Sequence, residues 1–579
     1  MKIKSLLIGM LACSALVACT NDDLLEDNEN LENGKVEQSY ISVNLVNPVA
    51  KSRAFQDGDD NEQEVKRARF YLFNSDGSAY QINDATGTKN FVDTDVDELN
   101  LDPTYNSGSD NVETICQAVL VIDKSKKEPP TSIVAVLNYP LDSNGECLWG
   151  DGEKSLTDLT SAAMAYNHGT IKTEAGVEKP YNSKGNFVMT NSVYVDEGNN
   201  RTVMKATPIA ANNIQATAQK ANENAVEIYV ERIAAKVEVT MTSSFTKGND
   251  GFYTISTGLT DANKKEITAK ILGWKVTNIT DKSYLLKNLS SNYTSFNGHV
   301  GAATSWVWND EGNFRSYWAN TTDLSTPTHP WIFDDVTNGF EETNNWEYYN
   351  ENTHSTTHSQ LLVVAEFIVD GKATPIAEWY GVKYTYAGLQ QVVANALAKK
   401  IYTRTGTEGN YKYNSITPAA ISFKQDPSSK ESDRYLSRAV VEFVENTYFD
   451  ENQTVYDEEG LKEVLATVHP AKIWGNEIAK EDGSKTYVGG GYYYIDIVQN
   501  DGKITKDAEG KVTSDTNVYG LVRNHWYQIT LSDLNGLGTP VYNPDEIIKT
   551  EKPDTDESYI AAKIKVLAWN IKSQSVTLE

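Results

Sequence analysis

The sequence predicts a mainly β protein with at least two β-sandwich domains. Its 579 residues are more than one hydrophobic core usually organises, so two or more domains are expected. The composition is rich in Tyr, with 32 residues, and poor in Met, with 6, which favours sheets over helical bundles. Short runs with apolar residues at every second position alternate with clusters of Gly, Asn, Asp and Ser, the pattern typical of sandwiches.

The charge excludes some classes of partner. A formal net charge of −28 argues against nucleic acid and against peripheral binding to anionic membranes, because both need clustered Lys and Arg. The sequence also offers no catalytic constellation and no metal-ligand set, so neither an enzyme nor a cofactor is predicted. The closest approach is His354 and His358, four residues apart, but their Thr- and Ser-rich surroundings favour a surface loop.

The N-terminus carries an export signal. Residues 1–19 combine Lys2 and Lys4 with a short apolar run and end in Leu16-Val-Ala-Cys19. That ending fits the bacterial lipobox, in which the cysteine is acylated after signal-peptide cleavage, so lipidation of Cys19 and a lipid anchor in the outer membrane are predicted. The alternative is an ordinary secretory signal that contains a cysteine. Residues 20–38 are polar and acidic, as a flexible tether would be.

A strand follows the tether directly. Ile41, Val43 and Leu45 alternate with polar residues, which predicts a half-buried strand within 39–53. The strand ends in a basic loop at Arg53-Ala54 that precedes an acidic run. A strand held between an anchor and a possible cleavage point is one that proteolysis could remove.

The remaining chain divides into two predicted sandwich domains, 54–225 and 226–542. Strands are expected near 65–73, 118–122, 132–137 and 187–195 in the first domain, with a helix near 156–166. The second domain is expected to have strands near 227–241, 267–278, 361–369, 491–498 and 525–531. Three helical patterns, centred on Leu389–Leu397, Val440–Val444 and Leu461–Leu465, predict an inserted helical lobe.

Two other features leave alternatives open. Of the four cysteines, Cys116 and Cys147 lie outside the signal and are either paired or free. A group of aromatic residues could stack on sugars, although packing in cores and loops is the favoured role. They are Trp306, Trp308, Tyr317, Trp318, Trp331, Trp346 and Tyr348.

The C-terminus predicts a strand pair behind a linker. Residues 543–559 are charged and contain two prolines, which indicates an extended linker. In 560–579, Ile564, Val566 and Ala568 alternate with other residues, as do Val576 and Leu578. Such strands could add to the sheet edge of another molecule, or they could complete the sheet of their own domain.

Three motifs resemble the fimbrilins of Bacteroidota, the subunits of type V pili. They are Val230-Glu-Arg-Ile-Ala-Ala-Lys-Val237, Tyr349-Asn-Glu-Asn-Thr353 and, most specific, Tyr519-Gly-Leu-Val-Arg-Asn-His-Trp-Tyr527. Leu534-Asn-Gly-Leu-Gly-Thr-Pro540 and Val566-Leu-Ala-Trp569 add to the likeness, which is greatest to the major subunit of short fimbriae.

The resemblance implies two transthyretin-like Greek-key β-sandwich domains, with a few helices inserted in the second. It implies that a protease removes the first strand, here by cutting at Arg53-Ala54 or, with a trypsin-like enzyme, at Lys51. The C-terminal strands of another copy, with Ile564, Val566, Ala568, Val576 and Leu578, would then fill the groove left by Ile41, Val43 and Leu45.

The expected role is therefore a shaft subunit of a surface fimbria that supports adhesion and biofilm formation. Its expected partners are other copies in a head-to-tail filament, accessory fimbrial subunits and a host surface ligand. The alternatives are a tip adhesin for host glycan or protein, and an uncleaved glycan-binding surface lipoprotein.

Overall fold

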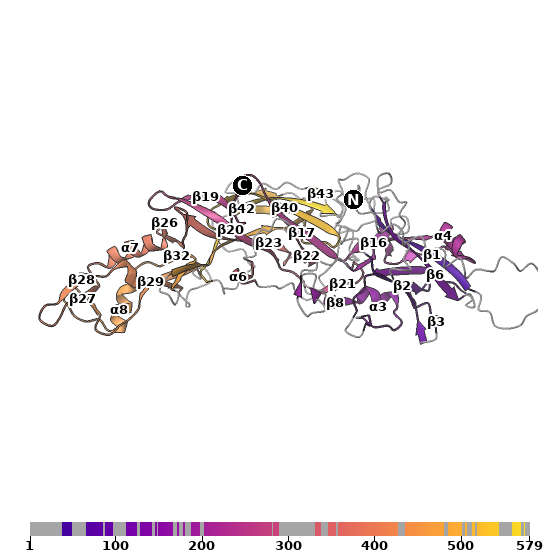
Figure 1. Cartoon of the computed structure of the whole chain (residues 1–579), viewed down its shortest axis with the longest axis horizontal. Helices are drawn as coiled ribbons and strands as arrows, with labels where there is room; N and C mark the ends of the chain where they lie inside the picture. Colours follow the sequence, from indigo (N-terminus) through magenta and orange to yellow (C-terminus); the bar gives the residue numbers. More distant parts are fainter. Residues whose placement is uncertain are drawn as a thin grey trace, which may run out of the picture.

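Three structural units follow one another along an elongated molecule (Figure 1). The structure is a computed structural model that describes residues 38–48, 65–84, 87–95, 112–123, 128–141, 145–147, 149–165, 171–172, 178–179, 187–196, 202–280, 282–288, 331–336, 346–354, 357–425, 435–479, 485–500, 504–506, 512–515, 518–543, 559–568 and 572–573. A first sandwich occupies one end, a second sandwich the middle and a smaller lobe the other end. Strands dominate all three units, so the prediction of a mainly β fold is confirmed.

The first sandwich is one continuous set of hydrogen-bonded strands folded into two layers. Along the path they are β15 (Ile214–Gln215), β1 (Gln38–Pro48), β16 (Val226–Arg232), β11 (Met189–Asn191), β7 (Ser132–Leu137), β2 (Arg67–Phe73) and β5 (Phe91–Asp95), with β6 (Val112–Asp123) on β1 and β14 (Thr207–Pro208) on β7. The first half of β16 pairs with β1 and the second half with β11. Apolar residues of β1 and β6 share one core with those of β2 and β7, so the two parts face each other.

The second sandwich has two separate sheets. One contains β22 (Trp346–Asn350), β17 (Ala234–Met241), β40 (His525–Asn535), β42 (Tyr559–Ala568) and β43 (Lys572–Ser573), in that order. The other contains β18 (Thr246–Lys247), β19 (Tyr253–Thr260), β20 (Glu266–Thr277), β23 (Gln360–Val369), β35 (Gly490–Asp496) and β41 (Thr539–Val541), with β24 (Lys372–Ala373) on β23. Alternate residues from both sheets, such as Val237 and Val363, fill the core between them.

The third unit, which we call the inserted lobe, lies between β24 and β35 in the chain. Its main sheet has the order β26 (Val382–Thr385), β25 (Ile376–Trp379), β32 (Ala471–Trp474), β30 (Leu436–Val441) and β29 (Ile421–Gln425). A smaller sheet contains β28 (Lys412–Ser415), β27 (Tyr402–Thr405) and β31 (Tyr448–Phe449). Helices α7 (Tyr386–Leu397) and α8 (Glu458–Leu465) pack on these strands around a core of their own.

Local sequence explains the two helices of the lobe. Thr385 caps α7 by accepting a hydrogen bond from the Gly388 amide at 3.1 Å, and Asp457 caps α8 in the same way. Leu389, Val393 and Leu397 of α7 are buried, as expected for residues four apart on one helix face. Two of the three predicted helices of the lobe are thus confirmed.

Shorter elements complete the fold. Among the described residues there are seven two-stranded ribbons. They pair β3 (Ile82–Asp84) with β4 (Gly87–Lys89), β8 (Ala163–Ala165) with β21 (Lys282–Tyr284), β9 (Ile171–Lys172) with β10 (Glu178–Lys179), β12 (Tyr194–Asp196) with β13 (Thr202–Met204), β33 (Asn476–Ala479) with β34 (Lys485–Val488), β36 (Val498–Asn500) with β39 (Val518–Tyr519), and β37 (Ile504–Lys506) with β38 (Val512–Asp515). The short helices are α3 (Leu156–Ser161), α4 (Ala218–Glu223) and α6 (Phe333–Val336), with 3-10 turns at Ala211–Asn213 and Pro418–Ala420. No helix in the described ranges is long and apolar enough to cross a membrane.

Two features differ from the sequence expectations, and a third decides between two open alternatives. The predicted helix of the lobe at Val440–Val444 is wrong, because Val440 and Val441 are the last residues of β30, which pairs with β29. Strand β16 lies in the first sandwich, so that sheet extends past the domain boundary expected at residue 225. Cys147 is a buried free thiol, so it is not paired with Cys116.

Candidate functional site

The N-terminal strand lies inside the first sandwich. Strand β1 pairs with β6 along its whole length, from Gln38 opposite Asp123 to Pro48 opposite Val112. On its other side it pairs antiparallel with β15 at Tyr40 and Ile41, and parallel with β16 from Val43 to Val46. Because both edges of β1 are hydrogen-bonded, its removal would leave a slot between β6 and the β15–β16 side. We call this slot the β1 groove.

The inward residues of β1 belong to the core of the first sandwich. Ile41 and Val43 are both 0% exposed and pack in the same cluster as Ala118, Leu120 and Ile228. Fully burying such side chains stabilises a fold by about 1.5–3 kcal/mol each, an upper estimate for an unfolded reference chain. The predicted half-buried strand is thus a central one. Leu45 lies opposite Cys116 in the β1–β6 pairing.

The C-terminal strand lies on the second sandwich. Strand β42 pairs antiparallel with β40 at ten positions, from Tyr559 opposite Asn535 to Ala568 opposite His525. In this register Ile564 lies opposite Ile529 and Val566 opposite Tyr527, two residues of the second core. In the free chain the segment therefore completes the sheet of its own domain, which is one of the two alternatives that the sequence left open.

Several predicted site residues lie outside the described residues. They are the lipidation site Cys19, the cleavage pair Arg53 and Ala54, and the terminal residues Val576 and Leu578. Of the predicted linker at 543–559, only its two end residues are described. These expectations remain predictions.

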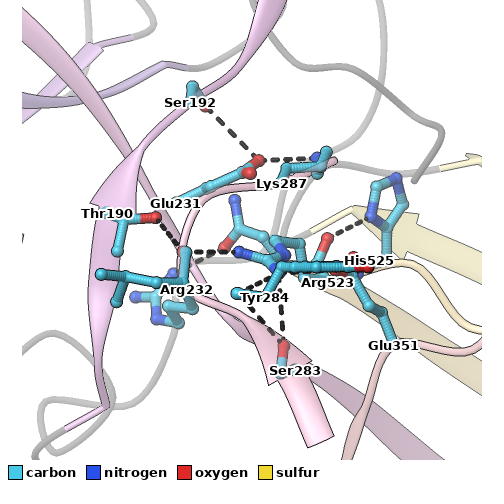
Figure 2. Close-up of polar contacts among 12 residues, drawn as sticks. Thr190, Ser192, Glu231, Arg232, Ser283, Tyr284, Lys287, Glu351, Arg523 and His525 are labelled. Carbon is cyan, nitrogen blue, oxygen red and sulfur yellow. Dashed lines mark hydrogen bonds and ion pairs between the residues drawn. The ribbon is translucent and has the colours of Figure 1, made fainter. Parts of the chain in front are cut away.

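A cluster of buried charges joins the two sandwiches. Glu231, Lys287, Glu351 and Arg523, which we call the junction cluster, have side chains that are all 0% exposed. Figure 2 shows them converging from four segments of the chain. Glu231 is in β16 of the first sandwich, while Glu351 follows β22 and Arg523 precedes β40 in the second.

The contacts of the cluster form a connected network. Lys287 Nζ donates to Glu231 Oε2 at 2.8 Å, and Arg523 Nη2 donates to Glu351 Oε1 at 2.5 Å. Arg523 also donates to the carbonyl oxygens of Tyr284 at 2.6 Å and of Leu285 at 3.1 Å. The Leu285 carbonyl accepts a further bond from Thr190 Oγ1 of the first sandwich, so this one oxygen links the two units.

Burial makes these charges costly when they are alone. It raises the pKa of the Glu231 carboxyl and lowers the pKa of the Lys287 ammonium, and the attraction between the two groups opposes both effects. Removing one partner of such a buried pair typically costs about 3–5 kcal/mol, whereas well-packed apolar replacements of both are often neutral. The cluster is therefore expected to add little net stability.

Backbone contacts hold the same joint. Strand β8 (Ala163–Ala165) of the first sandwich pairs with β21 (Lys282–Tyr284), which leads into Lys287. Leu285 and Leu286 pack in a core cluster with Tyr71 and Val134 of the first sandwich. The two sandwiches thus share both a ribbon and apolar packing.

The three motifs that carry the resemblance meet at this joint. Glu231, Glu351 and Arg523 each come from one of them, and Lys287 supplies the fourth charge. Neither the clustering nor Lys287 was predicted, because no periodicity links residues so far apart in sequence. The sequence feature that could have indicated these residues is a charged residue inside an otherwise apolar or strand-like motif.

The aromatic residues that the structure describes have packing roles. Tyr348 is buried in the core of the first sandwich with Trp346 against it, and Trp331 packs beside Phe333. The other four lie outside the described ranges. His358 is 3.1 Å from the Asp496 carboxylate, and no group of three or more potential metal ligands occurs within the described part of the chain.

Comparison with known proteins gives one family match. Residues 485–575 match the model described as major fimbrial subunit protein type IV, fimbrillin, C-terminal. This region contains both β40 and β42. No curated protein matches the sequence.

The solved structures that align with most of this chain do so with low sequence identity and low TM-scores. A candidate cell adhesion protein from Parabacteroides distasonis ATCC 8503 has 10% identity and a TM-score of 0.35, over 92% of this chain and 98% of that one. A fimbrilin from Porphyromonas gingivalis W83 has 11% identity and a TM-score of 0.29, over 93% and 99%. The tip fimbrial protein Mfa3 from the same species has 10% identity and a TM-score of 0.28, over 90% and 99%.

The match over β40 and β42 agrees with the motifs at Tyr519–Tyr527 and Leu534–Pro540. Through this C-terminal region, the chain is similar to the fimbrillins.

Proposed function

We propose that the protein is a structural shaft subunit of a cell-surface fimbria that polymerises by strand exchange. The observation that carries this proposal is the position of β1, which is hydrogen-bonded on both edges and contributes Ile41 and Val43 to the core. A strand in that position leaves a groove when it is removed, and the groove selects another strand with the same apolar alternation.

The processing steps follow from the predicted N-terminus. The precursor is exported as a lipoprotein acylated at Cys19, and cleavage at Arg53-Ala54 separates β1 and the anchor from the rest of the chain. The C-terminal segment of a second copy then enters the β1 groove. Because groove and donor are different surfaces, the contact does not close and generates a head-to-tail filament.

The donor strand must first leave its own sheet. In the free chain β42 pairs with β40, so donation requires that these ten paired positions separate. The C-terminal strands therefore complete the sheet of their own domain before assembly, and they add to the sheet of another copy afterwards. Accessory subunits and a host surface ligand are the further partners of this proposal.

The N-terminus of assembled protein tests the proposal. Filaments collected from cells should contain chains that begin near Ala54, and mass spectrometry would identify that residue. Acylated Cys19 on assembled chains would refute strand removal and favour the uncleaved lipoprotein.

A binding assay tests the groove directly. Trimmed protein should bind a labelled peptide of residues 559–579, whereas uncut protein, whose groove holds β1, should not. Deleting residues 560–579 should leave a protein that accepts the peptide but does not polymerise. Filaments formed by the deletion variant would show that the donor strand lies elsewhere in the chain.

A further inference from the structure

We propose that the junction cluster fixes the angle between the β1 groove and the C-terminal donor strand within one subunit, and so sets the straightness of the filament. Glu231, Lys287, Glu351 and Arg523 act as positioning residues in this proposal. The roles of the β1 groove and the donor strand rest on the proposed function, whereas the rigidity of the joint does not.

The cluster lies where the two assembly elements come together. Val226–Tyr229 of β16 form one side of the β1 groove, and Glu231 follows two residues later on the same strand. Arg523 stands two residues before β40, which pairs with β42. Strand β16, which forms one side of the β1 groove, and strand β40, which pairs with the donor strand β42, thus both lie next to the junction cluster.

The bonding pattern favours one orientation. Glu231 of the first sandwich and Arg523 of the second both bond to the segment 284–287, Glu231 through Lys287 and Arg523 through the Tyr284 and Leu285 carbonyls. Arg232 Nη1 is also 3.4 Å from Asn524 Oδ1 across the joint. A rotation of one sandwich would separate these groups inside a buried interface, where an unpaired charge is strongly disfavoured. Orientations that differ from the observed one are therefore poorly populated.

The network is not arranged for the greatest stability. Glu231 Oε1 and Arg523 Nε are buried and have no hydrogen-bond partner among the described residues. Apolar side chains would avoid this cost. A cluster that is costly in stability but demanding in geometry is suited to defining an angle.

Neutral variants can separate orientation from folding. The β8–β21 ribbon and the packing of Leu285 and Leu286 also hold the sandwiches together. The double variant Glu231→Gln with Lys287→Met removes both charges of one pair at similar volume, so it should fold with a looser joint. The matched control is Glu458→Gln with Lys462→Met, which removes an exposed ion pair on α8.

The first readout is a distance distribution in the unassembled chain. Spin labels are placed at the exposed positions Ser75 in the first sandwich and Asn263 in the second, in a chain that starts at residue 20 and has Cys116 and Cys147 replaced. The double variant should broaden the distribution relative to the parent, and the control should not. An unchanged distribution in the folded double variant would overturn the proposal.

A second variant keeps the proposal testable if the double variant does not fold. If the double variant does not fold, Glu231→Asp is tested instead, because it keeps the charge but withdraws the carboxylate from Lys287. It should also broaden the distribution in chains that show a cooperative melt, and a distribution as narrow as that of the parent would contradict the proposal.

The second readout is filament shape. Trimmed double variant should form filaments that bend more in electron micrographs than those of the parent and of the control. Equal straightness would refute the link to the filament. If the trimmed parent itself does not polymerise, the proposed function fails, whereas the spin-label result still decides whether the joint is rigid.

Discussion

Shortening Ile41 to alanine should weaken the precursor but not the filament assembled from it. Ile41 is 0% exposed, lies opposite Leu120 of β6 and Ile214 of β15, and is part of the first core. Ile→Ala changes at such sites cost about 2–5 kcal/mol. At about 2–4 °C per kcal/mol for a domain of this size, the melting midpoint of the first sandwich should fall by roughly 4–20 °C.

Leu120 provides the matched control, because it faces the same core from β6 and stays in the chain after trimming. Leu120→Ala should destabilise the precursor to a similar extent and should also lower the denaturant concentration at which filaments dissociate. Precursor melting and filament dissociation in guanidinium are measured for both variants. If Ile41→Ala weakened filaments as much as Leu120→Ala does, β1 would still be present in them and the reasoning would be wrong.

Two further predictions concern the second sandwich. A Cβ at Gly490 would lie 2.0 Å from the Ala365 carbonyl oxygen, so Gly490→Ala should cost about 1–3 kcal/mol in chemical unfolding, whereas Gly152→Ala, with open space around it, should be neutral; equal effects would contradict the packing argument. The pKa of Asp250 lies below its usual value, chiefly because of its hydrogen bond with Lys270. A depressed folded-state pKa gives stability that is present above the unfolded pKa, near 3.8, and is lost as the pH falls through the folded value. Asp250→Asn should therefore lower the melting midpoint at pH 7 and have less effect near pH 3, and a loss that is independent of pH would exclude this origin.

Short apolar runs rich in β-branched residues were the most predictable part of the fold. The strand expected at 132–137 has the bounds of β7, and its last five residues are buried. Its short length and its Ile and Val residues distinguish such a strand from a buried helix. The segment at Val440–Val444 was predicted as a helix because its apolar residues are three and four apart. The residues that face the core there are instead Ser437 and Ala439, whose small size concealed the period of two.

Of the candidate site, the sequence predicted the N-terminal and C-terminal strands but not what they pair with. The alternation of Ile41 and Val43 indicated a strand with one buried face, but pairing on both edges depends on β6, β15 and β16, which are distant in sequence. The junction cluster depends on contacts between residues far apart in sequence, such as the bond from Arg523 to the Tyr284 carbonyl, 239 residues away. Local patterns do not contain such contacts, which arise when the two sandwiches close on each other.

The inserted lobe enters and leaves the second sandwich through neighbouring strands. It begins after β23 and β24 and returns at β35, and Ala365 of β23 lies opposite Gly491 of β35. Most of its core is a cluster of its own, but Ile376 of β25 and Trp474 of β32 pack in the core of the sandwich that carries it. The lobe also stands at the opposite end of the molecule from β1 (Figure 1). A graft in a loop of the lobe would leave β1 and β42 untouched, so the lobe offers a position for displaying foreign epitopes on the fibre proposed above.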